Sequence, residues 1–215
     1  MRKLLKITTT FALALVFTAG MAFGQDADIE QVGTNMDADI TQESRVGNNA
    51  SITQTGFDGE AGTNFAASIL QQGGDNTANV SQEGDTKPRA EVDQIGDGNY
   101  ADVAQTFGGR SNDLNFADVD QSGDENSASV TQSHFGAANS VITNVVGNVT
   151  QDGYSNSATL TQKGSGTYFR SDIVQNGDNN VASILQRDYG SSASSFDADI
   201  SQTGNMNNAD ITQTP

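Results

Sequence analysis

ADVDQSGDENSASVTQ, the stretch at residues 117–132, contains two copies of one five-residue unit joined by a short polar link. Each unit consists of a small residue, a polar residue, an aliphatic residue, a second polar residue and glutamine. This alternation has the period of two that is typical of a β-strand, so Ala117, Val119 and Gln121 share one face. The stretch therefore predicts two strands, each with an inward face and a polar outward face.

The unit recurs from one end of the chain to the other. Fifteen copies lie between Ala27 and Gln213, and self-similarity of this kind indicates a repeat architecture. Because the final glutamine has the inward parity, we expect these residues to stack as a fibre-forming ladder in the interior. Its glutamines are Gln31, Gln42, Gln71, Gln82, Gln94, Gln105, Gln121, Gln132, Gln151, Gln162, Gln175, Gln186, Gln202 and Gln213.

A longer pattern, QxGxxNxAxxxQ, sets the spacing between paired units. Gln31 begins one copy, in which Met36 stands at the asparagine position. The glycine suits a tight turn with positive φ, and the asparagine has the inward parity and joins the ladder. The six complete copies begin at Gln71, Gln94, Gln121, Gln151, Gln175 and Gln202. The turn glycines are Gly33, Gly73, Gly96, Gly123, Gly153, Gly177 and Gly204, and the inward asparagines are Asn76, Asn99, Asn126, Asn156, Asn180 and Asn207.

Strand, turn and strand together predict one coil of a β-solenoid. A single coil buries too little apolar surface to be stable alone. Stacking at about 4.8 Å pairs each backbone with the coils above and below and places identical amide side chains in hydrogen-bonded columns. We therefore expect residues 25–215 to form an all-β, amyloid-like cross-β solenoid of about seven or eight coils.

Two segments fit the pattern poorly. Residues 50–54 form a strand unit without a clear partner, and residues 140–144 form a degenerate unit with Asn144 in place of glutamine. Aromatic residues lie near the links: Phe65, Phe169 and Phe196 each come two residues before the small residue that opens a strand unit. By parity they are expected to face inward and fill the open end of a coil.

Residues 1–24 have the features of a secretory signal peptide. Arg2, Lys3 and Lys6 precede an apolar stretch, and small residues follow up to Gly24. A membrane anchor needs about 20 apolar residues, and this stretch is shorter and interrupted by threonine and glycine. Export with cleavage after Gly24 is therefore expected, and the absence of cysteine means that disulfides do not stabilise the exported chain.

The exported chain is strongly acidic. Removal of residues 1–24 leaves seven Lys and Arg residues against 27 Asp and Glu residues, a net charge near −20. Such a chain repels nucleic acid and anionic lipid, so neither is an expected partner. Only 34% of the full sequence is hydrophobic, so stability must come from backbone pairing rather than from a large apolar core.

The ends of such a solenoid are the expected site of assembly. No capping segment is evident near Asp26 or after Gln213, and an uncapped end presents unpaired strand edges to the next copy. Head-to-tail contact of this kind propagates into a homopolymer. Outward acids should repel along the stack, so we expect assembly to accelerate with salt or lower pH. These acids are Asp28, Asp39, Glu91, Asp93, Asp102, Asp118, Asp120, Asp172, Asp199 and Asp210.

The motif QxGxxNxAxxxQ and its A-x-I/V-x-Q strands resemble the repeat of the curlin family, the major and minor subunits of bacterial curli fibres. The resemblance extends from Ala27 to Gln213. It implies a secreted subunit that passes an outer-membrane export pore, meets a nucleating subunit and assembles at the cell surface into extracellular functional-amyloid fibres, or pili. Those fibres would serve cell adhesion and the biofilm matrix, with the inward Gln and Asn residues governing growth.

Two other functions remain open from the sequence. Gly-Asp pairs at Gly74, Gly96, Gly123 and Gly177 suggest a calcium-binding solenoid, although calcium β-rolls have a nine-residue period that this chain lacks. A monomeric solenoid could instead bind a surface such as ice or a polysaccharide through a flat face, but its outward positions mix Asp, Ser, Asn and Thr.

Nothing in the sequence predicts an enzyme, a cofactor or a specific metal site. His134 is the single histidine and is expected in a loop without a role. The carboxylates occupy equivalent positions in successive coils, so no pair is singled out for acid and base catalysis.

Overall fold

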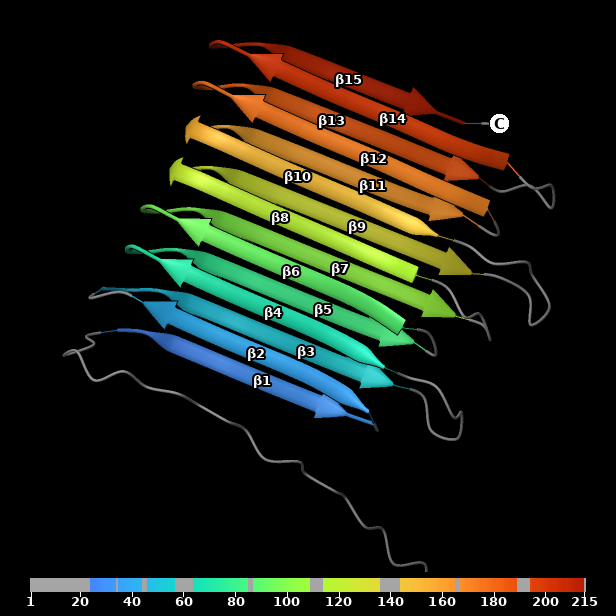
Figure 1. The fold of residues 1–215 in the computed structure, drawn as a ribbon, viewed down its shortest axis with the longest axis horizontal. Helices are drawn as coiled ribbons and strands as arrows, with labels where there is room; N and C mark the ends of the chain where they lie inside the picture. The colour runs from blue at the N-terminus through green and yellow to red at the C-terminus, as the bar shows by residue number, and fades with distance from the viewer. Residues whose placement is uncertain are drawn as a thin grey trace, which may run out of the picture.

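The computed structural model describes residues 24–33, 35–43, 46–56, 64–84, 87–108, 114–135, 144–164, 167–188 and 194–214. Within these ranges the chain forms fifteen strands in two parallel sheets, which we call the odd and the even sheet (Figure 1). The odd sheet consists of β1 (Asp26–Val32), β3 (Asn49–Gly56), β5 (Thr77–Gly84), β7 (Tyr100–Gly108), β9 (Ser127–Phe135), β11 (Ser157–Gly164), β13 (Val181–Asp188) and β15 (Asn208–Gln213). The even sheet consists of β2 (Met36–Glu43), β4 (Phe65–Gln72), β6 (Lys87–Ile95), β8 (Leu114–Asp124), β10 (Val145–Tyr154), β12 (Thr167–Asn176) and β14 (Ser194–Thr203).

Each strand pairs with the strand two places away in sequence, which is the connectivity of a solenoid. The predicted all-β solenoid is therefore confirmed: two strands make one coil, and fifteen strands make seven coils and one further strand. Strands of the two sheets run in opposite directions (Figure 1). The sheets therefore have a turn edge, where even strands lead into odd strands, and a loop edge, where odd strands lead into even strands.

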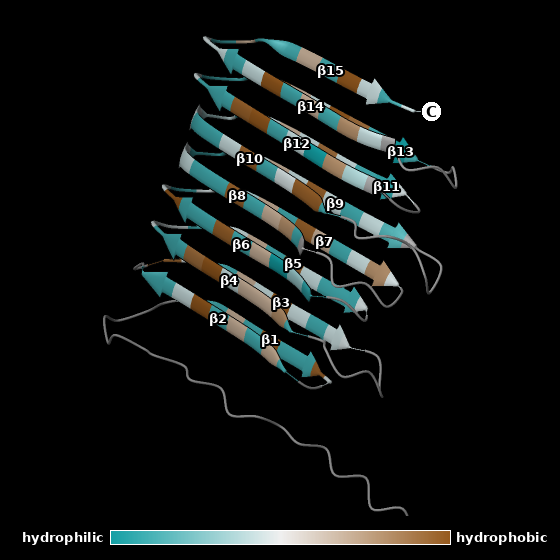
Figure 2. Ribbon diagram, turned by 45° about the vertical axis from the view of Figure 1, so that its right-hand side comes forward, coloured by the Kyte–Doolittle hydropathy of each residue, from teal (hydrophilic) through white to brown (hydrophobic). Residues whose placement is uncertain are grey.

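The register places like residues over like residues. In the even sheet Val119 pairs with Val149 and Gln121 pairs with Gln151. Away from the two ends of the solenoid, the inward aliphatic side chains are buried, as Val119 at 0% and Val149 at 1% exposure illustrate. Outward residues alternate with them along each strand, and Figure 2 shows this alternation of hydrophobic and hydrophilic residues. The prediction of one buried face per strand is confirmed.

The turn edge requires glycine at one position. All seven predicted turn glycines have positive φ: the six at the turn edge range from 98° at Gly204 to 125° at Gly153, and Gly33, between β1 and β2, has 139°. Coils also approach closely here: a Cβ on Gly123 would lie 2.1 Å from the carbonyl oxygen of Gly153 in the next coil. Only glycine fits both constraints, so the stacking distance itself selects this residue.

The structure corrects the predicted pairing at the first coils. Gln31 was expected to begin a coil like Gln71, but β1 lies in the odd sheet and its turn at Gly33 lies at the loop edge. Residues 50–54, expected to lack a partner, lie in β3, which pairs with β1 and β5. The link before β3 is one residue longer in sequence than the other links at the turn edge, and this hid the match.

The loop edge is lined by apolar side chains. Phe65 and Phe169 are each 1% exposed, as predicted, and Phe196 is partly buried and stacks on Phe169 with 5.3 Å between ring centroids. His134, expected in a loop, is instead 4% exposed near the end of β9, because that strand continues past its repeat unit. Residues 140–143 of the degenerate unit at 140–144, and residues 1–23 of the predicted signal peptide at 1–24, lie outside the described residues.

Gly123→Ala should destabilise the folded monomer by at least about 2 kcal/mol, because alanine is strained at positive φ and its Cβ meets the next coil. The matched control is Gly108→Ala, because a Cβ there has nothing within 4 Å. Urea unfolding followed by circular dichroism measures both variants. Equal midpoints for the two would contradict the stated role of close stacking.

Candidate functional site: the amide ladders

Two columns of glutamine run the length of the solenoid, one in each sheet. Within each column, the Nε2 of one glutamine donates to the Oε1 of the glutamine in the next coil toward the C-terminus, at 2.7 to 3.2 Å. The odd column is Gln31, Gln54, Gln82, Gln105, Gln132, Gln162, Gln186 and Gln213. The even column is Gln42, Gln71, Gln94, Gln121, Gln151, Gln175 and Gln202.

The same amides join the two sheets. Gln94 Nε2 also donates to the backbone oxygen of Thr77, at 3.1 Å, in the strand that precedes it in the other sheet. Every ladder glutamine from Gln42 to Gln213 makes a bond of this kind. Each buried amide therefore has both donors satisfied only when the preceding strand of the other sheet and the next coil are both in place.

Asparagine forms a third column at the turn edge. The Oδ1 of each residue accepts the backbone N–H of the next asparagine along the axis, at 2.9 to 3.0 Å. In the first five members Nδ2 donates to the carbonyl of the turn glycine in the next coil, as Asn99 does to Gly123 at 2.7 Å. The column is Asn48, Asn76, Asn99, Asn126, Asn156, Asn180 and Asn207.

The structure brings all predicted ladder residues into these columns and adds two that the sequence pattern missed. Gln54 is 0% exposed and bonds Gln31 and Gln82, and Asn48 is 0% exposed and bonds Asn76. The signal for both was present in the Gly-Asn and A-x-I-x-Q sequence at residues 47–54. The part these residues play in fibre growth stays a prediction.

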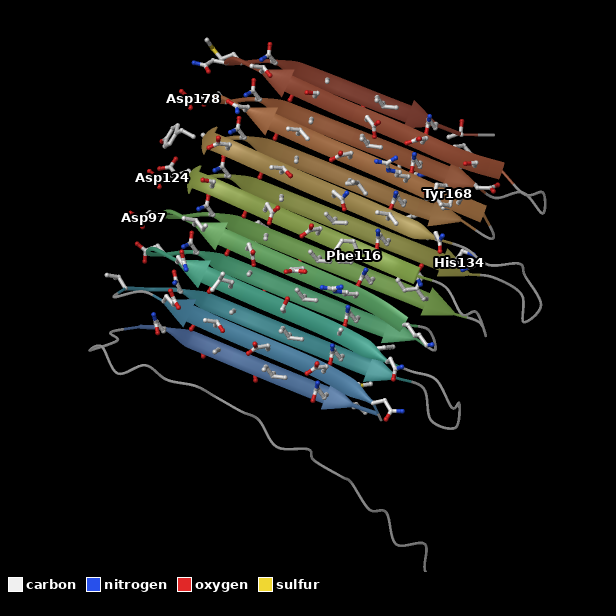
Figure 3. The ribbon with its side chains drawn as sticks, in the orientation of Figure 1. Asp97, Phe116, Asp124, His134, Tyr168 and Asp178 are labelled. Atoms are coloured by element: carbon white, nitrogen blue, oxygen red, sulfur yellow. The ribbon has the colours of Figure 1, made fainter. Side chains whose placement is uncertain are left out.

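The aspartates that suggested calcium binding have a different environment. In the turns, Asp97 and Asp124 each accept the backbone N–H of the preceding turn, at 2.7 and 2.9 Å, and Asp178 accepts that of Tyr154 at 3.1 Å (Figure 3). These carboxylates thus extend the axial hydrogen bonding. Among the described residues no cluster of three or more Asp, Glu, His or Cys side chains could hold a metal ion.

Four outward acids form the most crowded charge cluster. Glu91 pairs with Asp118, and Asp93 pairs with Asp120, on the neighbouring strands β6 and β8. Burial raises the pKa of Asp118 from 3.8 to about 6, and the nearby carboxylates add to the rise while Arg89 opposes it. Burial followed by carboxylate repulsion also raises the pKa of Asp93 and Asp120.

Among the described residues, one cation opposes the charge of this cluster. Arg89 lies 3.1 Å from Glu91 and places its guanidinium over Phe116, with 5.3 Å to the ring centroid. The strands on either side carry neutral residues in the same rows, Ser68 and Leu70 on β4 and Asn148 and Thr150 on β10. The repulsion is therefore local to two strands.

Comparison with known proteins identifies one part of the repeat. Residues 113–142, which contain β8 and β9, match the family model of the curlin associated repeat. No curated protein and no solved structure matches the chain. In the described part of the chain, no helix has the length and apolar character needed to cross a membrane.

Gln71→Leu should destabilise the folded chain by about 2 to 4 kcal/mol, because Gln94 Oε1 loses its ladder donor and the carbonyl of Asn49 loses its partner. Gln72→Leu is the matched control: the same substitution on the next residue, whose side chain points outward and bonds the exposed Glu43. Urea unfolding compares them. A Gln72→Leu loss as large as that of Gln71→Leu would contradict the importance of the ladder.

Asp118→Asn should raise the stability of the folded chain at pH 8 by about 0.5 to 1 kcal/mol, a small effect because water screens this half-exposed group. A carboxyl whose pKa rises on folding holds its proton more tightly when folded. The wild-type penalty is therefore absent below about pH 4 and grows until about pH 6.

The measurement is the urea midpoint of wild type and Asp118→Asn at pH 4 and pH 8. Asp210→Asn on β15 is the control, because Ser183 lies opposite this aspartate on β13. A gain for Asp118→Asn that is equal at both pH values would contradict the electrostatic origin.

Proposed function

Because this chain is a curlin-repeat protein, we propose that it is an exported subunit that assembles with copies of itself into extracellular amyloid-like fibres. Family and fold indicate a structural protein rather than an enzyme. The proposal adds secretion by way of residues 1–24, location at the cell surface, and a role in adhesion and the biofilm matrix. A nucleating subunit and an outer-membrane export pore are the further partners proposed.

The observation that carries this proposal is that both ends of the solenoid have partly exposed inward residues and unpaired strand edges. Interior aliphatic residues are 0 to 2% exposed, whereas Ile29 on β1, Ile40 on β2 and Ile211 on β15 are only partly buried. The backbone edges of these strands face outward along the axis, and each edge offers the pairing groups of a parallel sheet. Another copy of the chain satisfies them in the way that coils satisfy one another.

The proposal also accounts for the amide columns. Asn and Gln side chains are costly to bury in a monomer unless every partner is in place. Continuous columns lower the number of incomplete ends per coil as the stack lengthens. Polymerisation therefore completes the hydrogen bonding that the monomer begins.

Residues 25–215 released from denaturant should assemble with a sigmoidal rise in thioflavin fluorescence, and the product should diffract near 4.7 and 10 Å, the spacings of stacked strands and packed sheets. Added salt should shorten the lag, because it screens the repulsion between outward acids that lie opposite one another in the even sheet, as Glu91 and Asp118 do. A monomer that stays folded and soluble at high concentration would refute the proposal. Folding that begins only on addition of calcium would favour the calcium-binding solenoid instead.

A further inference from the structure

The two ends of the solenoid both finish in the same sheet. β1 and β15 belong to the odd sheet, so this sheet has eight strands while the even sheet has seven. Strands alternate between the sheets along the axis, and the place after β15 therefore lies in the even sheet, above β14. A copy stacked without rotation puts its β1 over β15 and leaves that place empty.

We propose that successive copies are related by a half turn about the solenoid axis, so that β1 of the next copy pairs with β14 and its β2 pairs with β15. The inference rests on the proposed self-assembly and adds the orientation of the incoming copy. Odd and even strands run in opposite directions (Figure 1). A half turn therefore makes the incoming β1 parallel to β14, as every other neighbouring pair is.

Gln31 supplies the first argument. Every ladder glutamine after it donates to a backbone oxygen on the preceding strand of the other sheet, as Gln42 on β2 does to Asp26 on β1. Gln31 makes no such bond to any described residue, because β1 is the first strand of the described part of the chain. After a half turn, β15 of the previous copy takes that place, and its Asn208 stands where the acceptor is found in the other coils, directly before the small residue.

The turn that joins β1 to β2 supplies the second argument. Gly33 and Asn35 have φ of 139° and 57°, the same pair of positive values as Gly204 and Met206 at 98° and 58°. This turn is thus of the turn-edge kind but lies at the loop edge of its own copy. A half turn moves it onto the turn edge of the previous copy. A Cβ on Gly204 would meet nothing closer than 3.8 Å, so the place above it is open to receive that turn.

Met36 suits its neighbours in the previous copy and in its own copy. Its position in the repeat is that of the ladder asparagine, so its backbone N–H comes to the Oδ1 of Asn207, which accepts no bond from a described residue. The junction thus continues the column in which Asn207 bonds Asn180. Within its own copy Met36 pairs with Phe65. An apolar side chain at this one asparagine position therefore lies opposite Phe65 at the loop edge.

The glutamine columns close across the same junction. Nε2 donors of Gln202 and Gln213 face the next copy, since every glutamine before them donates in that direction. Among the bonds between described residues, none reaches the Oε1 of Gln31 or Gln42. The half turn sets Gln202 opposite Gln31 and Gln213 opposite Gln42, and it aligns ADITQ at 209–213 with ADITQ at 38–42.

The chain termini agree with this orientation. β15 ends at the loop edge and β1 starts at the turn edge (Figure 1). After a half turn, the start of the incoming β1 lies at the loop edge beside the end of β15. The end of β15 and the start of the incoming β1 then lie as the end of one strand and the start of the next do within one chain. The strands therefore continue past the junction without a gap.

Cysteine pairs distinguish the two orientations, because the chain has no cysteine of its own. Three outward residues suit this test: each is exposed and comes directly before a ladder glutamine. They are Glu30, Ser201 and Thr212. The half turn places Ser201 opposite Glu30 of the next copy, at about 4.8 Å between strands, within disulfide range. Unrotated stacking places Thr212 opposite Glu30 instead.

The experiment mixes Glu30→Cys with Ser201→Cys, and separately Glu30→Cys with Thr212→Cys, during assembly of residues 25–215, followed by mild oxidation and a non-reducing gel. The half turn predicts at least about ten times more cross-linked dimer in the first mixture, because cross-linking follows proximity. A second pair, Thr41→Cys with Thr212→Cys, should also cross-link, and Thr41→Cys with Ser201→Cys should not.

Thioflavin fluorescence is recorded on each mixture, which separates the two proposals. Three outcomes with fibres present would overturn the half turn and leave fibre assembly standing. They are more cross-linking in the Glu30 and Thr212 mixture, equal cross-linking in both mixtures, and no cross-linking in either. Absence of fibres from the wild-type chain would overturn the proposed function and the half turn with it. Each variant assembled alone is the control. It carries one cysteine at one end of the solenoid, because Glu30 and Ser201 lie at opposite ends.

Discussion

The structure depends on the pairing of buried amides from coil to coil. An interior of aliphatic side chains alone would tolerate a shift of one coil against the next, because Ile, Val and Leu pack in many ways. A buried glutamine does not tolerate a shift, because its donors and its acceptor must each meet a partner. The amide columns therefore fix the register, and the register in turn fixes the turns, the glycine positions and the stacking of like residues.

Much of this arrangement was predictable from the sequence because each local signal repeats. Alternation of period two gave the inward faces, and the glycine two residues after Gln71 or Gln94 gave the sites of positive φ. What the pattern could not give was the sheet to which each strand belongs. Gln31 and Gln71 begin nearly the same spacing pattern, yet they lie in different sheets, because sheet assignment depends on the order of the strands and not on any one residue.

Local departures were hidden for similar reasons. One additional residue before Asn48 was enough to conceal β3 from a fixed spacing, although the backbone accommodates it without loss of the asparagine bond to Asn76. His134 was expected in a loop because it follows a repeat unit, but strand pairing with β7 and β11 continues past that unit. Repeat units mark where a strand is well specified, and pairing with neighbours decides where it ends.

All the glutamine amides of the odd and even columns point the same way along the axis. A filament built from such units has chemically different tips, one with unpaired N–H groups and the other with unpaired carbonyl oxygens. The two tips need not grow at the same speed, and a short fragment that resembles β1 and β2 would block one of them while leaving the other free. A filament of these units would therefore have a direction that is set by its side-chain amides.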